Sequence, residues 1–135
     1  MTGILLTDKA RQFLQKPLIA YLTTITPEGY PHTVPVWFAL DGDEIAVIAV
    51  RSTRKVAHIQ ANPRGAVTIG GGPGDGGGYL LQGDLRVEED PDDAWMKRMI
   101  YRYESGQQAE KDITEWAPLD IIVIRLAIKR AIAVA

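Results

Sequence analysis

Three cations crowd the expected start of a short helix near the middle of the chain. Arg51, Arg54 and Lys55 lie in the run VRSTRKVAHIQANP, where Ser52 or Thr53 is placed to cap the helix. The helix dipole makes that end positive, so each cation there costs roughly a few tenths of a kcal/mol. Free N–H groups, two hydroxyls and three cations together form a good receptor for a phosphate. A solvated basic helix start is the alternative, and these residues alone do not decide between the two.

The rest of the chain offers no reactive side chain of its own. It has no cysteine, and neither of its serines, Ser52 and Ser105, lies in a G-x-S-x-G elbow. His32 and His58 lack metal-ligand spacing, so we expect no metal site and no catalytic residue, with His58 on a helix surface. The glycine run at residues 70–78 lacks the Lys-Ser/Thr pair of a P-loop and predicts a flexible hairpin loop or lid. Any reactive chemistry should therefore come from a cofactor.

The composition indicates a soluble globular protein and limits its partners. With 135 residues, the chain fits one domain over residues 1–135. The net charge of −2 and the pI near 5.6 give no overall basic field for nucleic acid, so an anion site must be local. No apolar run approaches a membrane span, and the first residues do not resemble a secretory signal. We therefore expect a cytoplasmic protein that binds a small phosphorylated molecule, without nucleic-acid or membrane partners.

The anion site would lie among short strands joined by tight turns. The pattern predicts strands at residues 18–26, 33–40, 44–50, 66–69, 79–88 and 119–128. Helices are expected at residues 8–15, in the basic segment, and between an N-cap at Asp90 and a stop at Gly106, while residues 107–117 are left undecided. Strand pairing should be interrupted at Pro35 and at Gly83. These spacings are typical of a mainly β protein, a small antiparallel barrel with peripheral helices.

A flat redox cofactor would suit this arrangement. Pro35 breaks the ladder beside the strand at residues 44–50 and can leave backbone groups free for a ring edge, while Trp37 supplies an aromatic surface. The same strands end at the anion site, so ring and phosphate would lie about one cofactor length apart. Trp37 as an ordinary core residue is the alternative. The last strand is apolar on both faces, and we expect part of its cover to come from a second copy in a homodimer.

The order and spacing of three runs resemble the pyridoxamine-phosphate-oxidase-like split-barrel family, and within it the flavin/deazaflavin oxidoreductase branch. The runs are IAYLTTITPEGYPHTVPVWFALDGDEI, RSTRKVAHIQANPRGAVTI and YLLQGDLRV. The similarity covers most of residues 18–87, with a weaker match at the final strand. It implies a six-stranded antiparallel split β-barrel, homodimeric, with two cofactor sites at the subunit interface.

The resemblance also implies where the cofactor would bind. Its phosphate would lie at the basic helix start, and its ring along two strand ends. The cofactor implied is FMN, with the 8-hydroxy-5-deazaflavin coenzyme as the alternative. The residues matched in this way are Arg54 and Lys55, with Arg51, Ser52 and Thr53 beside them, then Pro35, Val36, Trp37, Ala49 and Val50, and less closely Gln82.

Other positions depart from the true pyridoxamine phosphate oxidases. Those enzymes resemble one another in a basic residue at the position of Val34, a lysine at that of Ala39, and a C-terminal substrate segment that is missing before Ala135. We therefore expect hydride transfer to a small organic substrate rather than vitamin B6 oxidation. A non-catalytic flavin carrier, or a tetrapyrrole- or haem-binding sensor, is the alternative, and a purely structural barrel would leave Arg54 and Lys55 idle.

Overall fold

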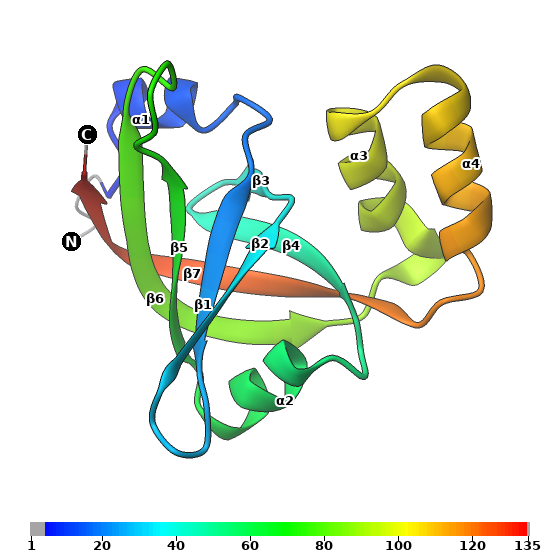
Figure 1. Ribbon diagram of the computed structural model, residues 1–135, viewed down its shortest axis with the longest axis horizontal. Helices are drawn as coiled ribbons and strands as arrows, with labels where there is room; N and C mark the ends of the chain where they lie inside the picture. The colour runs from blue at the N-terminus through cyan, green and yellow to red at the C-terminus, as the bar shows by residue number, and fades with distance from the viewer. Residues whose placement is uncertain (1–4, 135) are drawn as a thin grey trace.

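Seven strands and four α-helices run through residues 5–134, the part of the chain that the computed structural model describes (Figure 1). One short 3-10 turn, η1, precedes the third helix. In chain order the elements are α1 (Asp8–Phe13), β1 (Ala20–Ile25), β2 (Pro31–Val36), β3 (Ala39–Asp41), β4 (Glu44–Val50), α2 (Arg54–Ala61), β5 (Arg64–Gly70), β6 (Gly78–Glu88), η1 (Pro91–Asp93), α3 (Ala94–Tyr103), α4 (Gly106–Trp116) and β7 (Ile121–Ala133).

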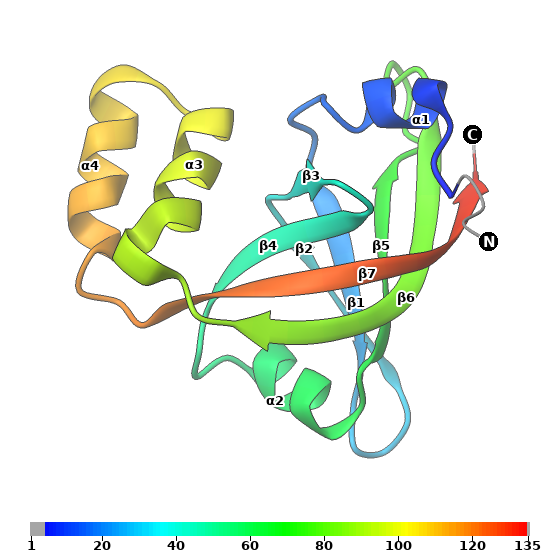
Figure 2. The same cartoon turned by 180° about the vertical axis from the view of Figure 1, so that it is seen from behind.

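The strands form one antiparallel sheet in the order β2-β1-β5-β6-β7-β4-β3. Its two edge strands, β2 and β3, follow each other in the chain and are separated only by Trp37 and Phe38. Three peptide steps span at most about 11 Å, so the two edges must approach each other and the sheet must curl. The curled sheet is visible from both sides in Figures 1 and 2.

The prediction of six strands is wrong, because the strand expected at residues 33–40 is two strands. β2 pairs with β1, and Pro35 of β2 lies opposite Tyr21 of β1. β3 instead pairs with β4. Pro35 has no N–H to donate, and it is tolerated because β2 is an edge strand. The expected interruption therefore occurs just after Pro35, at Trp37.

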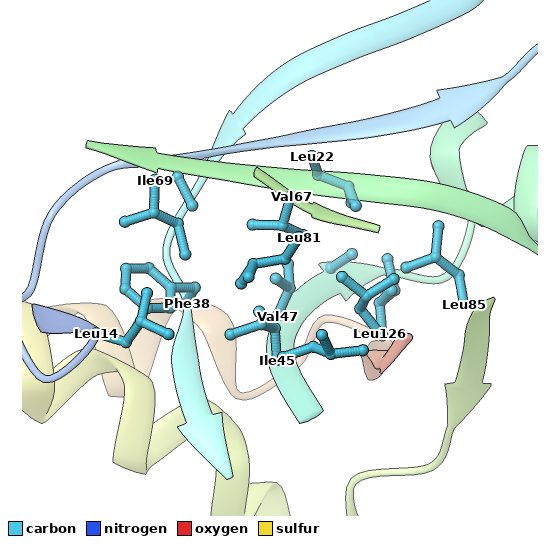
Figure 3. Packing of buried hydrophobic residues seen from close by; sticks show 14 of the residues in the cluster. Leu14, Leu22, Phe38, Ile45, Val47, Val67, Ile69, Leu81, Leu85 and Leu126 are labelled. Atoms are coloured by element: carbon cyan, nitrogen blue, oxygen red, sulfur yellow. The ribbon is translucent and has the colours of Figure 1, made fainter. Parts of the chain in front are cut away.

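The barrel interior holds the main hydrophobic core (Figure 3). Leu22, Ile45, Val67, Leu81 and Leu126 are fully buried there and come from five different strands. Alternate residues of β1 are buried, as expected for a strand with one face on a core. The sheet is thus held together mainly by apolar contacts across the barrel, to which β1, β4, β5, β6 and β7 each contribute at least two buried side chains.

A second apolar cluster lies between the α3–α4 hairpin and the barrel. It includes Met96, Ile100, Ala109 and Ile121. The hairpin stands beside one end of the sheet, next to the start of β7 (Figure 1). It therefore supplies, from the same chain, cover for the start of the last strand, at Ile121.

Two helix boundaries differ from those expected. Asp90 caps α3 from a distance, because its carboxylate accepts from the backbone N–H groups of Trp95, at 2.8 Å, and Met96, at 2.9 Å, across the turn η1. The undecided segment at residues 107–117 is mostly helical. Gly106 is the first residue of α4 and has φ +58°, a left-handed conformation that lets the chain change direction after α3 ends at Tyr103.

The glycine-rich segment connects the paired strands β5 and β6, so the predicted hairpin loop is confirmed, and hydrogen bonds within it and from Lys16 hold it. The N–H of Gly71 donates to the carbonyl of Gly77 at 2.7 Å, and the N–H of Gly72 donates to the carboxylate of Asp75 at 2.9 Å. Lys16 Nζ donates to the carbonyl of Asp75 at 3.0 Å. The bulge expected at Gly83 is confirmed, because the register of β6 against β7 shifts between Gln82 and Gly83. A Cβ at Gly83 would clash with the backbone carbonyl of Ala127.

No helix in residues 5–134 is long and apolar enough to cross a membrane.

Candidate functional site

A pocket of about 260 Å³ opens where β2 and β4 end. Six of the residues predicted from the sequence line it: Pro35, Val36, Trp37, Ala49, Val50 and Lys55. The other lining residues are Ile48, Trp116, Leu119 and Ile121. Four parts of the chain therefore meet at the pocket: the ends of β2 and β4, the start of α2, and the segment from Trp116 to Ile121. The sequence analysis predicted a site from the two strand ends and the start of α2 only.

The break between β2 and β3 is held open by α3. The backbone N–H of Phe38 donates to Tyr103 Oη at 3.0 Å, and Arg102 Nε donates to the carbonyl of Phe38 at 2.7 Å. These side chains satisfy backbone groups that a neighbouring strand would otherwise bond. Trp37, next to Phe38, stacks on the ring of Tyr103 and lines the pocket. Strand pairing is therefore interrupted at Trp37 and Phe38, where the ring of Trp37 forms one wall of the pocket.

Among the described residues that line the pocket, Lys55 brings the one positive charge. It lies in the first turn of α2, is half-buried, and takes part in none of the ion pairs found within residues 5–134. Burial lowers its pKa from the ordinary value of 10.5. A partly desolvated cation without a carboxylate partner is costly, and an anionic ligand would relieve that cost.

The residues that precede Lys55 at the start of α2, Ser52 to Arg54, do not line the pocket, and they differ in their contacts. Thr53 occupies the N-cap position of α2 but donates its hydroxyl to the carbonyl of Val50 at 2.8 Å instead of capping the helix. Ser52 and Arg54 are exposed and lie at the same helix start, outside the pocket lining. The free first turn and these two side chains are open to solvent, where a phosphate could reach them.

Arg51 is held by two carboxylates instead of facing the pocket. Its guanidinium donates to Glu89 at 2.6 and 2.9 Å and to Asp120 at 2.8 Å. These hydrogen bonds lower the pKa of both carboxyls. Glu89 precedes the α3–α4 hairpin and Asp120 follows it, so Arg51 ties together both connections of the hairpin.

Gln82 is placed apart from the other predicted residues. It is exposed on β6, between Ala66 of β5 and Arg130 of β7, and does not line the pocket of its own chain.

The sequence analysis missed the hairpin's contribution to the site. Trp116 lies in the polar segment that was left undecided, and Leu119 follows it. A signal was present, because Ala109, Ile113 and Trp116 recur at i, i+4 and i+7, which is the spacing of one helical face. Ala109 belongs to the apolar cluster beneath the hairpin, and Ile113 and Trp116 pack against that cluster.

The prediction that His58 is a surface residue is wrong. His58 is buried, and its Nδ1 lies 2.9 Å from the hydroxyl of Thr24. The ring of His32 meets it edge to face, with centroids 4.9 Å apart. The pair joins α2 to β1 and β2, outside the pocket lining.

The residues present fit a flat, phosphorylated cofactor. The pocket has an apolar wall that includes a tryptophan, and it has a cation with no ion-pair partner in the described residues at one end. The helix start beside that cation adds an exposed arginine and serine. Apolar walls with a few polar groups are typical of cofactor sites.

Comparison with solved structures shows that other proteins share this fold. A structure named F420 reductase has a TM-score of 0.75 at 21% identity, covering 94% of this chain and 98% of its own. A candidate pyridoxamine 5'-phosphate oxidase from Listeria innocua gives 0.70 at 22% identity, covering 94% and 96%. A conserved hypothetical protein from Mycobacterium tuberculosis gives 0.76 at 18%, covering 98% and 87%.

Comparison with curated protein sequences found no match. The family model described as Pyridoxamine 5'-phosphate oxidase, in contrast, matches residues 6–132, which is nearly the whole chain. The chain belongs to the pyridoxamine 5'-phosphate oxidase family.

Proposed function

We propose that this protein is an oxidoreductase that uses FMN, or alternatively the 8-hydroxy-5-deazaflavin coenzyme, to transfer hydride to a small organic substrate. The observation that carries the proposal is the half-buried Lys55, which lines the pocket and has no ion-pair partner among residues 5–134. Family membership and the similarity in fold to a structure named F420 reductase support it.

Each part of the site would have a separate task. Lys55 and Arg54, with Ser52 beside them, would bind the cofactor phosphate. Trp37 and the strand end that includes Val50 would position the ring and exclude water from one of its faces. When bound in its reduced form, the ring would supply the hydride and be oxidised in turn, so the chain needs no nucleophile of its own.

Vitamin B6 oxidation is not part of the proposal. The true pyridoxamine phosphate oxidases have a basic residue and a lysine at the positions of Val34 and Ala39, and both are apolar here. An anionic B6 substrate would therefore meet no charge from these two residues.

We also propose that the working form is a homodimer. Gln82 does not line the pocket of its own chain, although the resemblance places it near the cofactor. In a dimer, the Gln82 of a second copy could complete the site. A solution mass corresponding to one chain of 14.9 kDa at micromolar concentration would contradict this part of the proposal.

The test is a titration of the purified protein with FMN and, separately, with the deazaflavin coenzyme. We expect saturable binding of one of them, and the double substitution Arg54→Ala, Lys55→Ala should weaken it by more than about 2 kcal/mol, because charged hydrogen bonds contribute about 1.5–3 kcal/mol each. The matched control, Lys97→Ala with Lys111→Ala, removes two exposed helix cations and should leave the affinity unchanged.

Two results would overturn the proposal. Binding of neither cofactor would mean that the pocket serves another ligand. Tight binding without turnover on a panel of enones, quinones and tetrapyrroles would instead favour the non-catalytic carrier or sensor.

A further inference from the structure

The pocket has two walls that come from different parts of the fold. One wall is the end of the sheet, from β2 and β4, which the proposed function assigns to the cofactor ring. The other wall is the end of the α3–α4 hairpin, which contributes Trp116 and Leu119. This second wall has no task in the proposed function.

The hairpin wall is apolar and aromatic. Trp116 lies 5.8 Å from Trp37 between ring centroids, at an interplanar angle of 42°. Leu119 is 45% exposed and leaves apolar surface at the pocket. Within residues 5–134, no carboxylate lines this pocket, and its one cation, Lys55, belongs to the opposite end at α2.

The hairpin is fastened to the barrel by contacts that lie away from the pocket lining. Arg102 donates to the carbonyl of Phe38 and, at 3.0 to 3.2 Å, to those of Leu14, Gln15 and Lys16 beyond α1. At the other end, Arg51 holds the connections before and after the hairpin. These contacts position the wall without a ligand, which lowers the entropic cost of binding.

We propose that Trp116 is a specificity-determining residue that selects planar, uncharged ring compounds as substrates. A flat ring stacks favourably on an indole face, whereas a puckered or charged molecule of similar size loses that contact or its hydration. The whole pocket measures about 260 Å³, so the part of it beside Trp116 admits only a small ring system. The inference rests on the proposed function, because it reserves the sheet wall for the cofactor.

The test compares three probes by titration calorimetry on the protein saturated with its cofactor. The probes are 2-naphthol, its saturated and puckered counterpart 2-decalol, and the anionic naphthalene-2-sulfonate. We expect 2-naphthol to bind at least about tenfold more tightly than either of the others, in keeping with the strength of an aromatic contact plus the area that it buries.

Two tryptophan variants then locate the preference. Trp116→Leu should remove most of the advantage of 2-naphthol while leaving the cofactor dissociation constant within about threefold. Trp116→Phe should retain part of the advantage, since it keeps an aromatic face. The control is Trp95→Phe, because Trp95 lies on α3 against Arg98 and Arg125 and does not line the pocket.

Three outcomes would overturn the inference: equal affinity for the three probes, an unchanged preference in Trp116→Leu, or an equal loss of cofactor and 2-naphthol affinity in that variant. If the protein binds neither cofactor, the proposed function fails by itself. On the cofactor-free protein, 2-naphthol compared with 2-decalol would still decide whether Trp116 selects planar rings, because both probes are uncharged and do not compete for the charge of Lys55.

Discussion

The ring of Trp37 stacks on the ring of Tyr103 with centroids 4.8 Å apart and planes 5° apart. Tyr103 also receives the N–H of Phe38 at 3.0 Å and donates its hydroxyl to the carbonyl of Leu18 at 2.7 Å. The side chain of Tyr103 thus contacts the pocket residue Trp37, the break between β2 and β3 at Phe38, and Leu18 just before β1. The orientation of Trp37 is therefore set by the hairpin as well as by the sheet.

Removal of the Tyr103 hydroxyl should destabilise the protein without removing the stack. Tyr103→Phe leaves the N–H of Phe38 without that acceptor, and we expect a loss of about 1–3 kcal/mol in the free energy of unfolding. Chemical denaturation measures it. Tyr101→Phe on the same helix is the control, since Tyr101 is exposed and should change stability little. Equal effects of the two substitutions would show that the hydroxyl of Tyr103 is not a structural bond.

The charge of Lys55 should make cofactor binding and stability respond to pH in opposite directions. Its pKa is lowered by burial, so the cation is lost as pH rises through a value below 10.5, and the affinity for a phosphate should fall there. The cofactor-free protein should become more stable over the same range, because the unfolded chain binds the proton more tightly than the folded one. Titrations and denaturation between about pH 7.5 and about pH 10.5, a range that lies above the phosphate pKa of about 6, measure both.

The substitution Lys55→Arg is the control for this prediction. Arginine stays protonated over that range, so the affinity for the cofactor should become independent of pH. A pH dependence that persists in Lys55→Arg would assign it to another group.

A pair of carboxyl groups in the hairpin should weaken the protein at pH values above the folded-state pKa of Glu104. The pKa of Glu104 is raised, first by hydrogen bonding to Asp112 and then by burial and by the charge of that neighbour. Asp112 is buried and is also bound by Gln108 at 3.2 Å. A raised carboxyl pKa contributes stability that is fully present below the ordinary value of 4.5 and is lost as pH rises through the folded-state value.

Glu104→Gln should therefore raise the melting temperature at pH values above the folded-state pKa of Glu104 and have little effect below the ordinary value of 4.5. The amide can donate to Asp112 at any pH, whereas the wild-type carboxyl donates only when it is protonated. Thermal melts on both sides of this titration measure the difference. Glu110→Gln, at an exposed position of α4, should show no such pattern. A melting temperature of Glu104→Gln equal to wild type above that pKa would contradict the prediction.

Local sequence signals located the sheet wall of the site. Pro35 marked an interruption in an edge strand because its missing N–H is a local property, and the run from Ser52 to Lys55 marked a helix start by its own residues. The structure places Pro35, Trp37 and Lys55 along one pocket. The strands of this wall, β2 and β4, are not paired with each other, however; they meet because β3, which follows β2 after two residues, pairs with β4.

The hairpin wall could not be predicted in the same way. Trp116 reaches the pocket because α4 packs on Trp37 and Ile121. Trp37 is distant from Trp116 in the sequence, and Ile121 meets it only in the folded chain. The burial of His58 beside His32 and Thr24 is likewise a tertiary contact, since a helix position is exposed or buried depending on what packs there. The partners of Arg51 are also distant, and a basic residue beside an anion site looks the same in the sequence whether it is paired or free.

The family resemblance and the geometry of the structure disagree about the role of Arg51. The resemblance places it beside the cofactor phosphate, whereas its guanidinium here is bonded to Glu89 and Asp120. If those bonds persist when cofactor binds, Arg51→Ala should weaken FMN affinity by less than about threefold, while Lys55→Ala weakens it by about tenfold or more. Equilibrium titration of FMN measures both. Equal losses would mean that Arg51 leaves its carboxylates to bind the phosphate, and Glu89→Gln with Asp120→Asn, which release it, should then strengthen binding.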